Sequence, residues 1–280
     1  MATSITHSLI QLALMEDIGN GDITTGALVD PDTMGIAEII AKQDMIIAGL
    51  EMVSLVFSYI APEPCHIQLE CTNGEMISKK QVVCIIKSTL KTLLEGERIA
   101  LNFLQRLSGI ATTTRSYVDI LGDRTRPIIV DTRKTIPGWR VLEKNAVRAG
   151  GAKNHRMGLY DGVLIKDNHI KVCGGIIPAI NKVRKQVSHL SKIEVEVENL
   201  EQLEEALSAK ADVIMLDNMS IDKIHQAVKI ANKRALLEVS GGMTRDHVKE
   251  LADSGVDIIS IGGLTHSAKA VDLSMGIQTL

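Results

Sequence analysis

Residues 192–217 read KIEVEVENLEQLEEALSAKADVIMLD, two short β-like runs with a helical pattern between them. Leu200, Leu203 and Leu207 share one face of a helix over the middle part, and Asn199, with Gln202 three residues later, is a suitable N-cap. A strand, a helix and a second strand in close succession are typical of a βαβ unit, whose strands are parallel. The stretch therefore predicts a parallel sheet covered by helices.

The same alternation continues on both sides of this stretch. Further β-like runs cover residues 127–131, 161–167, 235–242 and 256–263. Helical patterns follow Ser220 and Thr244, which are plausible N-caps, and Gly255 is a plausible stop signal. About six βα units in a row predict a TIM-like α/β barrel, either complete or incomplete, with its active site at the carboxyl ends of the strands.

The residues before this pattern read differently. An amphipathic helix is expected up to about Met15, and a second helix over residues 51–60. Short strands are expected over residues 35–43, 45–49, 66–71 and 82–88. A long helical pattern over residues 93–121 then leads into the barrel. We therefore expect two domains, an N-terminal α+β domain over residues 1–110 and the barrel over residues 111–280.

Composition excludes several classes of protein. The 280-residue chain is 45% hydrophobic, which is ample for a core, but its net charge is −3 and only 2% of it is aromatic. Neither value favours a nucleic-acid or membrane-surface partner. The four cysteines show no CxxC or zinc spacing, the start lacks the basic region of a signal peptide, and no apolar run is long enough to span a membrane. A cytoplasmic protein with reduced thiols is expected.

Positive charge is concentrated in one segment of this acidic chain. From Asp131 to Lys171 there are nine Lys and Arg residues and four acids, a local charge of +5, so the remaining residues carry −8. This island predicts a site for a small polyanion, because Arg and Lys at strand ends can bind carboxylate and phosphate. The residues favoured for binding are Arg133, Lys134, Arg156 and Lys166. For Lys144, Arg148, Lys153 and Lys171, a solvated helix face is the preferred interpretation.

The run KIEVEVE carries acids at every second position. A parallel strand that is buried on both faces should be almost continuously apolar, so one face of this strand is acidic. Glu196, nearer the strand end than Glu194, and Asp217 on the next strand could together hold Mg²⁺. An edge strand with a wet face is the alternative.

Two double glycines end the last two predicted strands. They occur in Ser240–Gly241–Gly242 and in Ile261–Gly262–Gly263. Barrels of this kind often bind phosphate there through backbone N–H groups. Tight strand-to-helix turns without a ligand are the alternative.

The segment DTRKTIPGWRVLEKNAVRAGGAKNHRMGLYDGVLIKDNHI (131–170) closely resembles the central signature of the quinolinate phosphoribosyltransferases, also called carboxylating nicotinate-nucleotide pyrophosphorylases. Further matches are LMEDIGNGDITT, ERIALNFLQRLSGIAT, IEVEVENLEQLEEAL, DVIMLDN, EVSGG and ISIGGLTHS. The resemblance implies an N-terminal α/β sandwich followed by an open, incomplete α/β barrel. It also implies conversion of quinolinate and phosphoribosyl pyrophosphate into nicotinate mononucleotide, pyrophosphate and CO₂ with Mg²⁺, in de novo NAD biosynthesis. Homodimers or higher homo-oligomers with shared active sites are expected.

The resemblance also implies roles for individual residues. Arg133, Arg156 and Lys166 match residues that bind the quinolinate carboxylates, with Lys134 and Thr135 beside them and His155 lining the same pocket. Arg106 matches an arginine donated across the dimer, and Glu196 and Asp217 match acids that serve the ribose hydroxyls and Mg²⁺. The two double-glycine segments match phosphate-binding loops. The residues expected to be catalytic are Lys134, Lys166, Glu196 and Asp217.

Three positions depart from the family pattern. Ala152 stands where a third glycine is common, Gly263 stands where alanine is usual, and residues 76–88 (MISKKQVVCIIKS) lack the glycines often found in that hairpin. None of these departures removes a functional group, so they bear on loop details.

Three other functions remain open at this stage. A paralogous family linked to molybdate-uptake operons shares the fold, but it varies in the NHR and IKDNH segments, which are intact here. A Schiff-base aldolase could use Lys166 or Lys134 as its nucleophile, and borohydride trapping would label it covalently. A non-catalytic sensor of pyridine or phosphate metabolites would bind without turnover.

Overall fold

The computed structural model describes residues 2–60 and 65–280, which form two compact units. The first comprises residues up to Arg115 together with Thr135–Gly151 and Leu264–Leu280, and the second comprises Ser116–Lys134 and Ala152–Gly263. The units thus differ from a single division near residue 110, since two later segments return to the first unit. Within the described ranges, no helix combines the length and apolar character needed to cross a membrane.

The first unit is built on antiparallel strands. A four-stranded sheet has the order β12–β1–β5–β3, and β2 pairs with β4 separately. The strands are β1 (Met34–Ala41), β2 (Met45–Ile46), β3 (His66–Leu69), β4 (Met76–Ile77), β5 (Val82–Thr89) and β12 (Leu273–Thr279). The helices are α1 (Ala2–Asp17), α2 (Ile23–Leu28), α3 (Leu50–Ile60), α4 (Leu90–Leu121), α5 (Arg140–Ala149) and α11 (Gly263–His266). The predicted α+β character of this part is confirmed, and the chain passes into the second unit within α4.

Local patterns explain these elements. Burial alternates residue by residue along β1, so Ala37, Ile39 and Ala41 face the core while their neighbours do not. Helices α3 and α4 pack closely, because a Cβ added at Gly96 would lie 2.4 Å from Cε1 of Phe57. A larger residue at Gly96 would separate the two helices.

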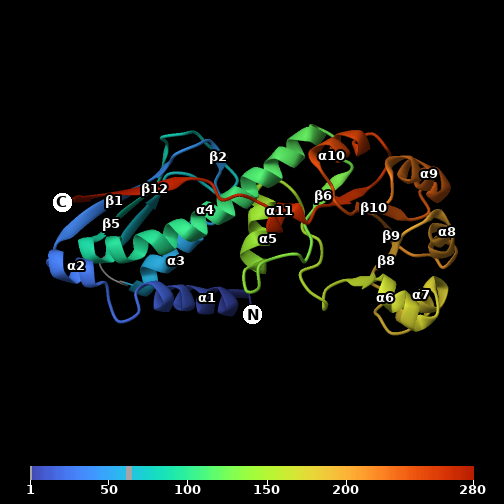
Figure 1. Cartoon of the computed structure of the whole chain (residues 1–280), viewed down its shortest axis with the longest axis horizontal. Helices are drawn as coiled ribbons and strands as arrows, with labels where there is room; N and C mark the ends of the chain where they lie inside the picture. Colours follow the sequence, from blue (N-terminus) through green and yellow to red (C-terminus); the bar gives the residue numbers. More distant parts are fainter. Residues whose placement is uncertain (1, 61–64) are drawn as a thin grey trace. The chain divides into compact units, whose positions relative to one another are not determined.

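The C-terminal strand β12 was not anticipated from the sequence. It pairs antiparallel with β1, from Gly35 opposite Thr279 to Ala41 opposite Leu273 (Figure 1). The two partners lie at opposite ends of the chain, and a local sequence pattern carries no information about such distant pairing. Strand β12 therefore forms one edge of the four-stranded sheet.

The turn between β4 and β5, which belong to different sheets, forms without glycine. The Gln81 N–H donates to the carbonyl of Ser78 (3.0 Å), which closes a four-residue turn. Lys80, the third residue, has φ +74°, the left-handed region that a type II turn requires at this position. The lack of glycine in residues 76–88 therefore places a lysine in a conformation that favours glycine.

We expect the substitution Lys80→Gly to raise the free energy of unfolding by roughly 0.5–1 kcal/mol. Glycine removes the steric cost of the left-handed backbone, although its greater freedom in the unfolded chain offsets part of this gain. Urea unfolding of both proteins measures the difference. The matched control is Lys79→Gly, because Lys79 does not have a positive φ, and its stability should fall. A less stable Lys80→Gly protein would contradict the argument.

The second unit is a parallel sheet of six strands. Its order is β6–β11–β10–β9–β8–β7, and each neighbouring pair is parallel. The strands are β6 (Ile128–Val130), β7 (Val163–Ile165), β8 (Ile193–Val197), β9 (Val213–Asp217), β10 (Leu236–Ser240) and β11 (Ile258–Ser260). Because β6 and β7 are edges, the sheet is an open, incomplete barrel, as the sequence predicted.

Helices follow most of these strands. They are α6 (Asp167–Cys173), α7 (Ile176–Arg184), α8 (Leu200–Ser208), α9 (Ile221–Ala231) and α10 (Arg245–Leu251). Figure 1 shows α7, α8 and α9 along one side of β8, β9 and β10. Each connection therefore returns the chain to the side of the sheet at which the strands begin. The carboxyl ends of all six strands consequently lie together on the opposite side.

The predicted helix ends are largely confirmed. Asn199 Oδ1 accepts the N–H of Gln202 (2.9 Å), and Thr244 Oγ1 accepts the N–H of His247 (3.3 Å). Ser220 occupies the N-cap position of α9, but its side chain makes no capping hydrogen bond. Gly255 has φ +93° but lies beyond the end of α10, whose C-cap is Ala252, so its role is in the turn before β11.

Candidate active site

The carboxyl ends of the six strands carry most of the residues singled out above. Asp131, Arg133 and Lys134 follow β6, Lys166 follows β7, Glu196 lies in β8, Asp217 ends β9, Ser240 ends β10, and Ile261–Gly263 follow β11. Because the strands are parallel and in register, all of these residues lie at one edge of the second unit. Arg106 and Thr135 belong to the first unit.

Strand β8 is an inner strand of the sheet, and its acidic side chains are largely shielded from solvent. It lies between β7 and β9, and the Glu194 residue is only 7% exposed. The alternative of a wet edge strand is therefore wrong. In the register, Glu196 is opposite Met215, so Asp217, two residues later, faces the same side from the neighbouring strand.

Lys166 and Glu196 form an ion pair. Lys166 Nζ lies 2.9 Å from Glu196 Oε2, and the carboxylate side chain is 12% exposed while the lysine side chain is 47% exposed. The backbone N–H of Lys166 donates to Nδ1 of His169 (3.0 Å), which fixes the start of α6. The lysine thus stands at the rim with its ammonium beside a strand-end carboxylate.

Two arginines lie close to each other at the same rim. Burial lowers the pKa of Arg156 from its usual value, and the positive charge of Arg133 lowers it further, while Glu194 and Asp161 act in the opposite direction. Arg156 Nη1 donates to the carbonyl of Gly162 (3.0 Å). Bringing two guanidinium groups together favours the binding of an anion between them.

His155 lies among carboxylates. Its Nε2 is 3.1 Å from Glu194 Oε2 and 3.6 Å from Glu238 Oε1. The His155 N–H donates to Asp131 Oδ1 (2.9 Å), and Nδ1 of the ring accepts the N–H of Arg156 (2.8 Å). Both ring nitrogens thus face groups of the protein, a role that differs from simply lining a substrate pocket.

Glu238 was not among the residues predicted from the sequence. This residue is 1% exposed in β10, and burial, followed by the negative charge of Glu194, raises its pKa from 4.5 to about 7, while His155 acts in the opposite direction. A signal was available, because Glu238 is the one charged residue in the apolar run ALLEVS. A single acid inside such a strand needs a polar partner in the core.

Arg106 is held within the first unit. Its Nε donates to Glu143 Oε1 (3.0 Å) and its Nη2 donates to the carbonyl of Thr265 (3.1 Å). Glu143 is fully buried, and its second oxygen accepts the N–H of Ile136 (3.2 Å). In the same unit, Thr135 Oγ1 accepts a hydrogen bond from Arg140 Nε (3.0 Å). These contacts fix the orientation of the Arg106 side chain.

The remaining cations of the basic segment mostly face solvent. Arg148, Lys153 and Lys171 are exposed, as the sequence predicted. Lys144 is the exception, because its side chain is fully buried in the first unit. The assignment of Lys144 to a solvated face was therefore wrong, and the cause is that α5 buries most of its surface.

The loop after β10 requires glycine. Gly241 has φ +101°, and a Cβ added there would lie 2.2 Å from Asn218 Oδ1, in the loop after β9. Gly242 also has a positive φ, +56°. By contrast, a Cβ added at Gly263 would meet nothing within 4 Å, so the alanine usual at this position would also fit. That departure from the family pattern is sterically neutral.

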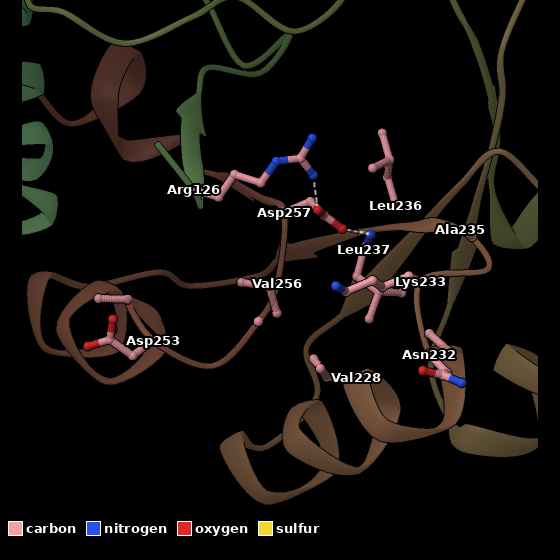
Figure 2. Close-up of a pocket in the computed structure, with 13 residues that line it drawn as sticks. Arg126, Val228, Asn232, Lys233, Ala235, Leu236, Leu237, Asp253, Val256 and Asp257 are labelled. Atoms are coloured by element: carbon pink, nitrogen blue, oxygen red, sulfur yellow. Dashed lines mark hydrogen bonds and ion pairs between the residues drawn. The ribbon is translucent and has the colours of Figure 1, made fainter. Parts of the chain in front are cut away.

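A cavity of about 680 Å³ lies at the opposite, amino ends of the strands (Figure 2). Arg126 pairs there with Asp257, whose Oδ2 accepts the N–H of Leu237 (2.9 Å). These charges satisfy one another, and the amino ends of strands in such barrels serve stability. We therefore place the candidate site at the carboxyl ends.

Comparisons with known proteins agree with this geometry. Residues 22–108 match the family model described as "Quinolinate phosphoribosyl transferase, N-terminal domain", and residues 110–276 match the corresponding C-terminal domain. The chain is 45% identical over 269 residues to a probable carboxylating nicotinate-nucleotide pyrophosphorylase of Bacillus subtilis, covering 96% of this chain and 92% of the relative.

Two further relatives extend the comparison. A decarboxylating quinolinate phosphoribosyltransferase of Nicotiana tabacum is 37% identical and is matched over 97% of this chain and 82% of its own length. The solved nicotinate-nucleotide pyrophosphorylase of Francisella tularensis superposes with a TM-score of 0.91 at 39% identity, over 98% of this chain and 96% of that one.

Proposed function

The chain belongs to the quinolinate phosphoribosyltransferase family, and we propose that it converts quinolinate and phosphoribosyl pyrophosphate into nicotinate mononucleotide, pyrophosphate and CO₂. This reaction is a pentosyl transfer that supplies the pyridine ring of NAD. The relatives that match nearly the whole chain carry the name of this activity. Of the alternatives, the family assignment disfavours a Schiff-base aldolase.

The observation that carries the proposal is the arrangement of charges at the carboxyl edge of the barrel. The positive charge of Arg133 is close enough to Arg156 to lower the pKa of Arg156. Lys166 follows β7, the edge strand at the opposite end of the strand order from β6. Quinolinate has two adjacent carboxylates on a flat ring. Two guanidinium groups and an ammonium are opposite in charge to this dianion, and Arg binds carboxylates through paired hydrogen bonds.

The acids suit the other substrate and a metal ion. Glu196 and Asp217 face the same side from neighbouring strands. Glu196 Oε2 accepts from Lys166 and Asp217 Oδ2 accepts from Asn218, so among the described residues the second oxygen of each carboxylate is left for further contacts. Oxygen ligands of this kind fit Mg²⁺, which usually binds through one or two carboxylates together with substrate phosphates. When bound, Mg²⁺ would offset negative charge on the pyrophosphate.

The residues of the chain act mainly by orientation and charge. The cations Arg133, Arg156 and Lys166 hold the quinolinate carboxylates, so the ring nitrogen is aimed at C1′ of the ribose. The carboxylates of Glu196 and Asp217 favour the positive charge that develops on the ribose as pyrophosphate leaves. After the nitrogen is alkylated, the positively charged pyridinium ring stabilises the electron pair left at C2 when the 2-carboxylate leaves as CO₂, and a proton from water then takes that position. No covalent enzyme intermediate is needed, so Lys134 and Lys166 act as charge partners.

The segments Ser240–Gly242 and Ile261–Gly263 are proposed to bind the phosphate groups. Gly241 and Gly242 both have positive φ, and successive backbone N–H groups in turns of this kind can form a concave anion site. Their place beyond β10 and β11 is the one at which such barrels commonly hold phosphate.

Oligomerisation completes the proposal. Arg106, oriented by Glu143 and Thr265, is proposed to reach the active site of a second copy in a homodimer or larger homo-oligomer that works in the cytoplasm.

A product assay with phosphoribosyl pyrophosphate and Mg²⁺ tests the function as a whole. Formation of nicotinate mononucleotide from quinolinate would support it, whereas binding without turnover would identify a metabolite sensor.

A further inference from the structure

Three ionisable side chains meet in the interior of the barrel beneath the proposed quinolinate site. The His155 ring comes from the segment beside β6, Glu194 comes from β8 and Glu238 comes from β10. Both glutamates are at least nine-tenths buried, with residue exposures of 7% and 1%. Charged groups that are buried so deeply need a specific arrangement of partners.

The arrangement has two possible explanations, a cation site or a hydrogen-bond network. One ligand atom from each of the three residues lies within 4.8 Å of the others, which is close enough to surround a metal ion. However, His155 Nδ1 accepts the N–H of Arg156 (2.8 Å), so a neutral ring carries its proton on Nε2. A protonated Nε2 has no lone pair for a metal but is a suitable donor to Glu194 Oε2, 3.1 Å away. The contacts therefore favour a hydrogen-bond network.

This network reaches the substrate-binding edge through the backbone. The His155 N–H is held by Asp131 Oδ1 (2.9 Å), and the next N–H, that of Arg156, is held by the His155 ring. The orientation of the ring therefore restrains the residue that carries the Arg156 guanidinium. A ring free to turn would release one of the hydrogen bonds that fix this backbone.

We propose that Glu238 is a positioning residue that, together with Glu194, locks the His155 ring in the Nε2-protonated orientation and so aims Arg156 at the substrate carboxylate. The inference rests on the proposed function, because it takes Arg156 to bind quinolinate. It adds a role for a residue in β10 whose side chain lies in the barrel interior.

Glu238 is suited to this role by its place in the sheet. Strand β9 separates β8 from β10, so the two glutamates approach the ring from different strands. Glu194 Oε2, 3.1 Å from Nε2, is within hydrogen-bond distance, whereas Glu238 Oε1, at 3.6 Å, attracts the Nε2–H group by its charge at longer range. The raised pKa of Glu238, about 7, means that the neutral form is accessible at physiological pH, so an uncharged side chain of the same shape should fit. Glu238 is also a clearer target than Glu194, which lies two residues from Glu196.

The test compares Glu238→Met with Glu238→Gln. Methionine keeps the length of the side chain but removes both oxygens, while glutamine keeps an oxygen acceptor. Replacing a buried charged group with an apolar one of similar volume is commonly tolerated, and thermal unfolding will show that the variants fold. If the methionine variant does not fold, Glu238→Leu takes its place. Glu250→Leu, on an exposed position of α10, is the matched control.

We expect Glu238→Met to raise the KM for quinolinate roughly 10- to 100-fold, because small displacements of a substrate-positioning group have effects of this size. The KM for phosphoribosyl pyrophosphate should change little, and Glu238→Gln and Glu250→Leu should stay near the wild-type values. A purely structural role for Glu238 would not separate the two substrates in this way. An unchanged KM for quinolinate in a folded Glu238→Met protein would overturn the proposal.

The state of the ring gives an independent measurement. In protein labelled with ¹⁵N-histidine, the His155 signals, identified by their loss in a His155→Gln variant, should show the Nε2-protonated tautomer in the wild type. They should show a mixture of tautomers in Glu238→Met. An unchanged tautomer in that variant would overturn the proposal even if activity fell. Failure of the proposed function would look different, because the wild-type protein would then turn over no quinolinate.

Discussion

Replacing Lys166 with alanine is expected to lower kcat/KM for quinolinate by roughly 100- to 1000-fold, the cost typical of removing one charged or hydrogen-bonding group that stabilises a reacting anion. The Lys166 ammonium stands at the rim, 2.9 Å from Glu196 Oε2, so its loss removes a substrate contact and also the partner of a strand-end carboxylate. Steady-state kinetics with both substrates measure the effect.

The control for this experiment is Lys171→Ala. Lys171 lies in α6, the helix that Lys166 precedes, and also forms an ion pair, 3.1 Å from Asp167, but its side chain is exposed. Exposed pairs of this kind contribute little, so both activity and stability should stay close to the wild type. A folded Lys166→Ala protein with near-normal kcat/KM would show that this lysine does not bind the substrate.

Mixing two inactive variants is expected to restore activity. Arg106→Gln removes the arginine proposed to reach a neighbouring active site but keeps an N–H donor for the buried Glu143. Lys166→Ala inactivates the site of its own subunit. In a heterodimer of the two, one site carries both substitutions and the other carries neither, so random mixing should recover about a quarter of the wild-type activity.

The subunits must be shown to exchange for this result to carry meaning. Affinity tags on one variant would retain the other variant when heterodimers form, and each variant alone, taken through the same unfolding and refolding, should stay inactive. If heterodimers form and no activity returns, Arg106 acts within its own subunit, and the proposal of shared active sites is wrong.

The sequence predicted the fold well where the signals were local. Alternating apolar runs and helical faces placed all six parallel strands, and the N-caps predicted at Asn199 and Thr244 are confirmed by their hydrogen bonds. The pairing of β12 with β1 was beyond reach, because the partners are separated by most of the chain. Local periodicity shows that a strand forms but does not show which strand it joins.

The candidate site could be predicted in part for the same reason. Charged residues at strand ends are visible in the sequence, and Lys166, Glu196 and Asp217 lie at the ends of neighbouring strands as expected. The cluster around His155 was missed, since its members come from three separate segments and meet only in the folded barrel. Lys144 was misjudged because charge alone does not reveal which face of α5 is buried.

The most direct test of the proposed function is the release of pyrophosphate and CO₂ by the purified protein with phosphoribosyl pyrophosphate and Mg²⁺, comparing quinolinate with nicotinate. Nicotinate lacks the 2-carboxylate, so it leaves one cation of the proposed clamp without its partner and offers no group to lose as CO₂. Equal amounts of pyrophosphate and CO₂ with quinolinate, and neither product with nicotinate, are the predicted result. No product with either acid, from protein shown to be folded and oligomeric, would contradict the assignment of this site.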